Sequence, residues 1–329
     1  MPAPNYIGAG DATVNEQENM DVTLNLSIVV PVYRAQGSLS ELCRRLIDTC
    51  REYFPSFEIL LVEDCGGDGS WPLIQQLADV HPELRGIQLS RNFGQHAATL
   101  CGIAQARGVW IATIDDDLEH PPESLPTLMA KAREGYDLVY GVFPERSHRW
   151  WRNITSDLAR RLFRAAIPSL NYDYTSLRLI RGSIARALIA FDSPFPFVDG
   201  YLSWLTSRCA KVDVPHLDRA HGNSNYTMRK LATHTLNIMV TFSDLPLRLA
   251  SWLGILSSLI GFVWLISIVV ERLIGHITSS GYASLMAGIV FFGGLQLLVL
   301  GVIGQYIGRI NFKSSRKPLF LIAHDTGTP

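Results

Sequence analysis

Short apolar runs and amphipathic segments alternate along residues 26–142 of the chain. Runs such as "LSIVVPVY" have the nearly continuous apolarity of strands that are buried on both faces. Between them, apolar residues recur every three or four positions, which predicts helices with one buried face. The expected strands are the segments 26–33, 57–64, 86–90, 109–115 and 136–142, with a helix after each of the first four.

This alternation predicts an α/β fold in which right-handed crossovers build a mostly parallel sheet covered by helices on both faces. Ligands bind at the carboxyl ends of the strands in such sheets. Polar turns follow three of the expected strands, with the sequences "VEDCGGDGS", "SRNFGQH" and "DDDLEHPPE". Their glycines would let a ligand approach the backbone, although each alone could be an ordinary turn glycine. We therefore expect a polar site at one edge of the sheet.

The C-terminal part of the chain has a different pattern. Residues 249–270 contain no ionisable side chain, and a second uncharged run extends over residues 277–308. Each is long enough to cross a bilayer, which takes about 20 residues. We expect a transmembrane hairpin with spans at 249–271 and 284–308, preceded by an interfacial helix at 226–248.

Charges flanking the two spans predict their orientation. Positive side chains lie before the first span and after the second, at Arg229, Lys230, Arg248, Arg309, Lys313, Arg316 and Lys317. Both outer flanks are therefore expected in the cytoplasm, with the α/β domain and both termini, at the inner (plasma) membrane. Residues 1–24 carry four acids and do not resemble a cleavable signal, so we expect a flexible tail there. An α/β domain at 25–225 and a cytoplasmic tail at 309–329 complete the expected organisation.

Composition narrows the possible partners. A formal net charge of -1 lacks the basic excess typical of nucleic-acid binding, so no nucleic-acid partner is expected. The five cysteines form no CxxC pair, and we expect reduced structural thiols. Gly304 and Gly308 have the GxxxG spacing of packed membrane helices, within the hairpin or between subunits, and we expect a homo-oligomer.

The acidic turn "IDDDLEHPPE" is the strongest chemical signal. Asp115, Asp117 and Glu119 alternate just past a strand, so they would project the same way from extended backbone. Oxygen ligands suit Mg²⁺ or Mn²⁺, commonly shared with substrate phosphates. A solvated acidic turn remains an alternative. An aspartyl phosphatase would place this run after its first strand, not its fourth. His96 and His120 lack metal-ligand partners and are expected to be hydrogen-bonded loop or cap residues.

Several motifs occur in the order seen in one known family. They are "PVY", "VED…DG", "RNFGQHAA", "IDDDLEHPPE", "REGYDLVYG", "DYTSLRLI", "HGNSNYT" and "IGQYIGRI". Over about residues 26–318 the chain resembles the membrane-anchored family 2 glycosyltransferases that act on polyprenyl phosphates. The resemblance implies a GT-A catalytic domain, Rossmann-like with a mostly parallel sheet, followed by a two-helix membrane hairpin. It also implies a nucleotide-sugar donor, UDP-linked in our interpretation, and an undecaprenyl phosphate acceptor in the lipid bilayer.

The resemblance also implies roles for individual residues. The residues that match or adjoin the family's donor-binding positions are Pro31, Tyr33, Asp64, Asn92, Gly94 and Asp115. Asp117 and Glu119 match metal-binding positions, with Asp115 beside them, and Asp117 also counts among the catalytic candidates. Asp173 matches a proposed catalytic base, and Arg178 matches a position that meets phosphate. A loop expected to close over the site contains Arg219, Ser224 and Tyr226.

Four positions depart from the family pattern. Arg34 and Ala35 replace an Asn-Glu pair, which puts the ribose contacts there in doubt. Glu119 stands where Gln is usual, and a third carboxylate should tighten metal binding or raise a pKa. Asn225 replaces a lysine of the closing loop. Arg229 and Lys230 are candidates to meet phosphate charge instead.

The implied reaction is an inverting displacement at the anomeric carbon by a phosphate oxygen of the lipid. Because a phosphate monoester is largely ionised at pH 7, Asp173 could either act as a base or only orient the acceptor. One rival function is a processive polysaccharide synthase, but its QxxRW motif is absent, and "HRWWR" at 148–152 is the nearest match. The other is an inactive nucleotide-sugar sensor or scaffold, against which the intact carboxylates argue.

Overall fold

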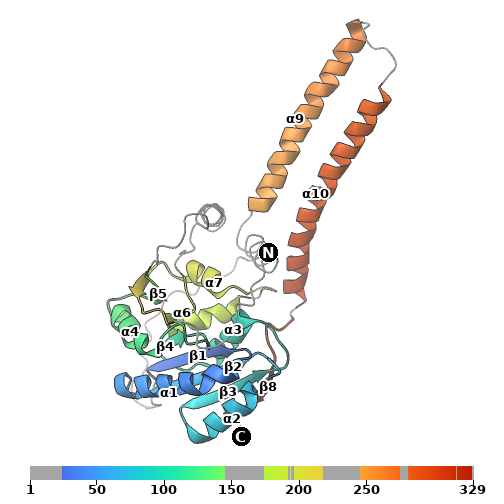
Figure 1. Ribbon diagram of the computed structural model, residues 1–329. Helices are drawn as coiled ribbons and strands as arrows, with labels where there is room; N and C mark the ends of the chain where they lie inside the picture. The colour runs from blue at the N-terminus through green and yellow to red at the C-terminus, as the bar shows by residue number, and fades with distance from the viewer. Residues whose placement is uncertain are drawn as a thin grey trace, which may run out of the picture.

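The computed structural model describes residues 24–144, 174–191, 193, 196–217, 245–274, 281–315 and 317–327. In the described part, eight strands form one sheet in the order β7-β5-β6-β4-β1-β2-β3-β8 (Figure 1). The strands are β1 (Leu26–Val32), β2 (Phe57–Glu63), β3 (Leu84–Leu89), β4 (Trp110–Thr113), β5 (Leu138–Val142), β6 (Arg178–Arg181), β7 (Cys209–Asp213) and β8 (Ile322–Asp325).

Parallel pairing dominates the sheet, as the sequence predicts. β1 pairs in parallel with β2 and with β4, β2 with β3, and β5 with β7. β6 is antiparallel to both β4 and β5, and β8 is antiparallel to β3. The prediction of a mostly parallel α/β sheet is therefore confirmed. All five strands expected before residue 145 are present.

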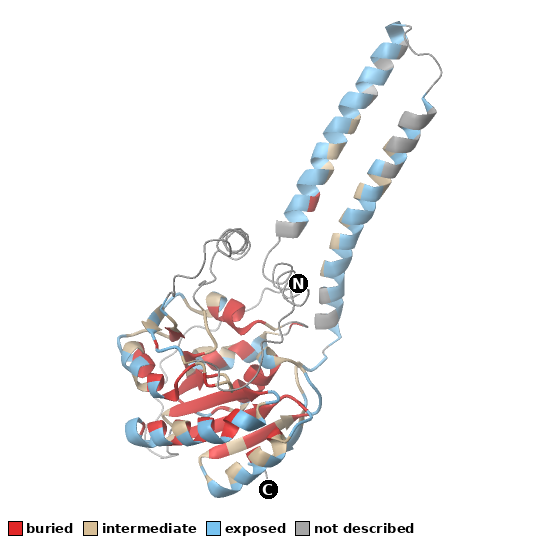
Figure 2. Cartoon of the chain, in the orientation of Figure 1, coloured by how far each residue is buried: buried red, intermediate tan, exposed pale blue. Residues whose placement is uncertain are grey.

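Helices cover both faces of the sheet. The catalytic-domain helices are α1 (Gln36–Tyr53), α2 (Ser70–Val80), α3 (Gln95–Gln105), η1 (Pro122–Ser124), α4 (Leu125–Arg133), α6 (Gly182–Ala187), η2 (Leu188–Ala190) and α7 (Val198–Leu205). Alternate residues of β1 face opposite ways, because successive strand side chains point to opposite faces. Ile28 and Val30 pack in the core with α1 and α4, whereas Val29 packs in the second core with α3, α6 and α7. Figure 2 shows the central strands buried between these layers.

The two long apolar helices expected at the C-terminal end are present. They are α9 (Leu245–Ile274) and α10 (Tyr282–Ser314), which project side by side away from the sheet (Figure 1). Their candidate membrane spans have mean hydropathies of 2.0 over Leu247–Ile268 and 1.5 over Phe291–Gly308. The expected tail at 1–24 and interfacial helix at 226–248 fall almost wholly outside the described residues.

The sequence predicts only a tail at residues 309–329, but the structure contains β8 there. Its Ile87↔Asp325 and Gln88↔His324 pairs add it to the edge of β3. Arg85 holds the carboxylate of Asp325 through both oxygens, at Nε–Oδ1 2.9 Å and Nη2–Oδ2 2.5 Å. The chain after the second long helix therefore returns to the catalytic domain.

Candidate active site

The sheet order places a topological switch point between β1 and β4. From β1 the chain proceeds through β2 and β3 on one side, and then crosses to β4 on the other. Helix-covered parallel sheets bind ligands in the crevice outside the strand ends at such a point. The acidic turn 115–120 follows β4, and Tyr33 and Arg34 follow β1. The edge at which the sequence predicts a polar site therefore coincides with the switch point, where sheets of this kind form a binding crevice.

Unfavourable backbone conformations gather at the same edge. In the described part of the chain, the non-glycine residues with positive φ are Arg34 (56°), Cys65 (52°) and Leu118 (64°). Each lies in the turn after β1, β2 or β4. Such conformations cost about 1–3 kcal/mol each and concentrate at functional sites. Their position supports the assignment of this edge as the site.

Asp64 joins two of the polar turns. Its buried carboxylate accepts the backbone N–H groups of Phe93 at 2.7 Å and Gly94 at 2.8 Å. Burial raises the pKa of Asp64, and the two N–H groups act against that rise. Gly94 has φ of +94°, which favours glycine there. Asp64 thus fixes the start of α3, with Asn92 exposed in the same turn.

Asp116, which sequence analysis does not single out, connects the acidic turn to β1. Its Oδ2 accepts the backbone N–H of Tyr33 at 2.9 Å, and its carbonyl accepts the hydroxyl of Ser38 at 2.6 Å. Arg34 reaches across to the neighbouring turn, where its Nε donates to the carbonyl of Gly66 at 3.0 Å. Pro31 is buried within β1, and the Tyr33 ring is exposed at its end.

The acidic turn holds carboxylates that are difficult to keep ionised. Burial raises the pKa of Asp115 to about 6, with the charge of Asp117 adding to the rise. Burial likewise raises the pKa of Asp116 to about 7. Asp115 Oδ1 accepts the side-chain amide of Gln95 at 2.6 Å, and Asp117 Oδ1 accepts the backbone N–H of Glu119 at 3.1 Å. A cation beside these groups would favour their ionised forms.

The residues fit a divalent cation that is completed by substrate. Among the described residues, no group of three or more His, Cys, Asp or Glu side chains is arranged to hold a metal ion. Magnesium-type sites, however, commonly use one or two carboxylates together with substrate phosphates, not an all-protein cage. Two half-buried carboxylates at Asp115 and Asp117, with elevated pKa at the first, match that requirement.

The His120 prediction is wrong in one respect. His120 is 6% exposed, and among the described residues neither of its ring nitrogens has a hydrogen-bond partner. Its ring instead stacks on Phe143 at a centroid distance of 4.3 Å, and Phe143 meets His216 edge-on, also at 4.3 Å. Burial lowers the pKa of His120 to about 4, so the ring is neutral at pH 7 and packs as an apolar plate.

Arg178 is present near the site, in a buried position. It begins β6, is 4% exposed and forms an ion pair with Asp199. Four other predicted site residues, Asp173, Arg219, Ser224 and Tyr226, lie outside the described residues. Their predicted roles therefore stay predictions.

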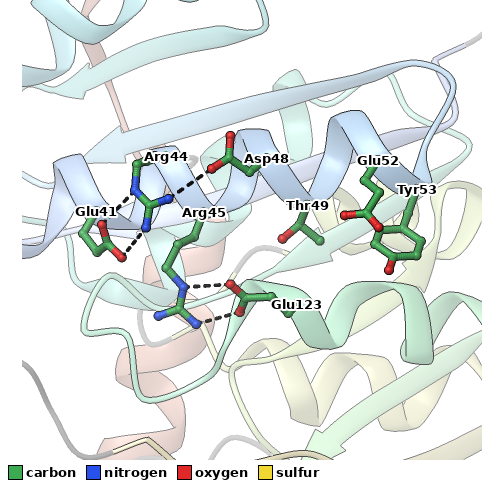
Figure 3. Close-up of a pocket in the computed structure, with 8 residues that line it drawn as sticks. All are labelled: Glu41, Arg44, Arg45, Asp48, Thr49, Glu52, Tyr53 and Glu123. Atoms are coloured by element: carbon green, nitrogen blue, oxygen red, sulfur yellow. Dashed lines mark hydrogen bonds and ion pairs between the residues drawn. The ribbon is translucent and has the colours of Figure 1, made fainter.

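A pocket of about 330 Å³ lies away from this edge, along α1 (Figure 3). Its arginines are already paired with its carboxylates: Arg45 with Glu123 at 2.6 Å, and Arg44 with Glu41 at 2.7 Å and with Asp48 at 3.1 Å. The Arg45–Glu123 pair attaches η1, which follows the acidic turn, to α1. We assign this pocket a structural role.

Comparison with known proteins identifies the class. Residues 27–187 match the family described as "Glycosyl transferase family 2". The undecaprenyl-phosphate 4-deoxy-4-formamido-L-arabinose transferase of Pseudomonas aeruginosa (strain LESB58) is 35% identical over 301 residues, which are 90% of this chain and 89% of that protein. The chain therefore belongs to glycosyltransferase family 2 and is a glycosyltransferase.

Other relatives also match most of the chain. The transferase of the same name from Aeromonas hydrophila subsp. hydrophila is 33% identical over 308 residues, covering 92% of this chain and 94% of that protein. The "Uncharacterized glycosyltransferase YkcC" of Bacillus subtilis (strain 168) is 31% identical over 306 residues, covering 92% and 95%. Glucosyl-3-phosphoglycerate synthase from Mycobacterium tuberculosis, in complex with phosphoglyceric acid, aligns with a TM-score of 0.47 at 17% identity, over 67% of this chain and 79% of that one. That structural likeness is too distant to support an inference about ligands.

Proposed function

We propose that this enzyme transfers a sugar from a nucleotide sugar to a polyprenyl phosphate in the membrane. One observation carries the proposal: a carboxylate-lined switch point and two membrane-length apolar helices occur in the same chain. A lipid-linked acceptor explains why the catalytic domain carries such helices. The relatives named for transfer to undecaprenyl phosphate support undecaprenyl phosphate as the acceptor. The UDP-linked donor rests on the resemblance of the sequence motifs to the family.

In the proposed reaction, a phosphate oxygen of the acceptor attacks the anomeric carbon of the sugar. The new C–O bond forms as the bond to the nucleoside diphosphate breaks, and the bonding electron pair leaves with the diphosphate. A phosphate monoester has its second pKa near 6 and is therefore largely ionised at pH 7. For this reason Asp173 need only orient the acceptor, although it could also act as a base.

The chain's own residues divide between binding and orientation. Pro31, Tyr33, Asp64, Asn92 and Gly94 would bind the nucleoside side of the donor. Asp115, Asp117 and Glu119 would hold Mg²⁺ or Mn²⁺ against the donor diphosphate. When bound, that ion would stabilise the negative charge that develops on the leaving diphosphate.

The closing loop and the membrane segments complete the proposal. Arg219, Ser224 and Tyr226 would close over the donor once it is bound. The helices α9 and α10 would span the bilayer, with the catalytic domain and both termini on the cytoplasmic side of the plasma membrane. The product would be a lipid-linked sugar for modification of cell-envelope glycans, and the protein would work as a homo-oligomer.

The test is transfer of radiolabelled sugar from a panel of nucleotide sugars into an organic-extractable lipid. Purified protein in detergent would be incubated with undecaprenyl phosphate and either Mn²⁺ or a chelator. Labelled lipid that forms only with both acceptor and metal supports the proposal. Metal-dependent donor binding with no labelled lipid from any donor would instead favour a nucleotide-sugar sensor.

A further inference from the structure

A buried network of polar side chains lies in the sheet directly behind the acidic turn. Arg178 is opposite Thr113 in the β4–β6 pairing and opposite Tyr140 in the β5–β6 pairing, so the three form one row across the strands. Side chains that are directly opposite share a face of the sheet. This is the face covered by α7, which contributes Asp199 to the network.

The hydrogen bonds that the Arg178 side chain forms in the structure are all made to members of this network. Its Nε donates to the Thr113 hydroxyl at 2.8 Å, and its Nη1 donates to Asp199 Oδ1. The Tyr140 hydroxyl donates to the same carboxylate oxygen at 3.1 Å. Both charged partners, Arg178 and Asp199, are only 4% exposed. Asp199 therefore fixes the direction in which the guanidinium points.

The positive charge of the Arg178 guanidinium also affects Asp115 in the acidic turn. Thr113, to which it is bonded, lies two residues before Asp115. Burial raises the pKa of Asp115, and the charge of Arg178 acts against that rise. Arg178 thus interacts with two carboxylates. It contacts Asp199 directly, and its positive charge acts on Asp115 without direct contact.

Loss of the Asp199 carboxylate would remove the direct ion-pair partner of Arg178. An unpaired charge in the protein interior is strongly unfavourable, so we expect Arg178 to form an ion pair with another carboxylate. The carboxylates whose charge acts on Arg178 are those of Asp199 and Asp115. A guanidinium that turns to Asp115 would occupy oxygens needed for the donor.

We propose that Asp199 is a positioning residue, oriented by Tyr140, that holds Arg178 within the sheet and so leaves Asp115 available to the donor. This rests on the proposed function, because it assumes that Asp115 serves the nucleotide-sugar donor. It also assigns Arg178 to the donor side of the site. The family resemblance, in contrast, implies that Arg178 meets phosphate.

The test compares Asp199→Asn with Asp137→Asn in the full-length protein in detergent. Asp137 pairs with Arg181 at 2.7 Å at the other end of β6, and this is a more exposed Asp–Arg pair away from the site. Calorimetry would measure UDP affinity in Mn²⁺, and lipid-transfer kinetics would give the acceptor KM. Asp199→Asn should weaken UDP binding about 10- to 100-fold, as expected for a residue that orients a ligand-binding group. Asp137→Asn should change it by no more than about twofold.

A milder variant keeps the proposal testable if Asp199→Asn does not fold, as judged by thermal melting. Tyr140→Phe removes one hydrogen bond to Asp199 and should weaken UDP binding by about two- to tenfold. Acceptor KM should stay unchanged in both variants. UDP affinities equal to that of Asp137→Asn would overturn the proposal. So would a raised acceptor KM with unchanged UDP affinity, which would show that Arg178 serves the acceptor.

The outcomes also separate this inference from the proposed function. Wild-type protein that binds UDP with Mn²⁺ but never forms glycosylated lipid would contradict the transferase proposal, while the binding comparison among variants would still be readable. Wild-type protein that forms glycosylated lipid, with Asp199→Asn indistinguishable from Asp137→Asn, would overturn the inference alone.

Discussion

The carboxylates of the acidic turn have different tasks at the scale of single residues. Asp116 accepts the N–H of Tyr33 and fastens the turn to β1, whereas Asp115 and Asp117 remain beside the switch point. The extended backbone expected for this segment is wrong beyond Asp115, because Asp116 and Asp117 lie in a turn and Leu118 has φ of 64°. The sequence does not reveal the partner of Asp116, because Tyr33 is 83 residues away and meets it only through the β1–β4 pairing.

Replacing Asp117 tests the proposed metal-binding role. Asp117→Asn keeps the size of the side chain and an oxygen for the Glu119 N–H, but removes the charge. We expect sugar transfer to fall about 10²–10³-fold, the usual loss when a group that stabilises developing charge is removed. Transfer assays with saturating Mn²⁺ would measure this. Asp48→Asn, in an exposed pair on α1, is the control, and an equal effect of the two variants would contradict the prediction.

The elevated pKa of Asp116 predicts a pH dependence of stability. In the fold this carboxyl has a pKa of about 7 because burial disfavours its ionised form, whereas the unfolded chain has the ordinary value of about 3.9. The folded state therefore retains a proton that the unfolded chain has lost. This contribution to stability is fully present below about pH 4 and is lost as pH rises to about 7.

Asp116→Asn should therefore reduce the fall in melting temperature between pH 4 and pH 7, in protein free of ligand and metal. The asparagine oxygen can still accept the Tyr33 N–H. Thermal melts of wild type, Asp116→Asn and Asp48→Asn across this range would measure the difference. The same pH slope in wild type and Asp116→Asn would show that this carboxyl titrates normally.

At the scale of elements, the hydrophobic pattern of a segment predicts those helices and strands that the segment's own sequence determines. The strands and helices before residue 145 follow from their own periodicity, because each buries a face that its own sequence defines. β8 does not follow from its sequence, "IAHD", which is short and has no strict alternation. Arg85, which binds Asp325, and Gly86, which binds Thr326 just after the strand, lie about 240 residues earlier, so only the folded sheet makes β8 a strand.

The Arg85–Asp325 pair should contribute measurably to the attachment of β8. The side chains are 22% and 10% exposed and share two hydrogen bonds. Asp325→Asn should cost about 1–3 kcal/mol of stability, the range for a hydrogen-bonded charged group. The exposed Arg44–Asp48 pair is the control, and Asp48→Asn should cost about 0–1 kcal/mol.

Hydrogen exchange would locate that loss. Faster exchange of the β3 amides in Asp325→Asn, with β1 unchanged, is the expected result because β8 covers only β3. Unaltered exchange on β3, with unaltered melting, would mean that this pair does not hold the strand.

At the scale of the whole molecule, β8 constrains the hairpin. Among the described residues, β7 precedes α9, β8 follows α10, and both belong to one sheet. Under the proposed function, the two outer ends of the hairpin would therefore lie on the same side of the membrane. The positive flanks predict the same arrangement, with that side in the cytoplasm. The length and apolarity of the helices could be read from the sequence, whereas the return of the chain to the sheet could not.

Cysteine labelling tests this arrangement. Native Cys65 is exposed beside the active site, and Gly281 lies at the start of α10, next to the connection between the long helices. A membrane-impermeant maleimide applied to intact cells should label Gly281→Cys and spare Cys65 until the cells are permeabilised. Labelling of Cys65 in intact cells would contradict a cytoplasmic catalytic domain.

The most direct test of the central claim is release of UDP from UDP-sugars by the purified protein in detergent. The assay would compare undecaprenyl phosphate with no acceptor, and Mn²⁺ with chelator, for each sugar. We predict that UDP is released only when acceptor and metal are both present, and that one sugar is preferred. Release that is independent of undecaprenyl phosphate, or no release with any sugar, would contradict the proposal that this enzyme glycosylates a polyprenyl phosphate.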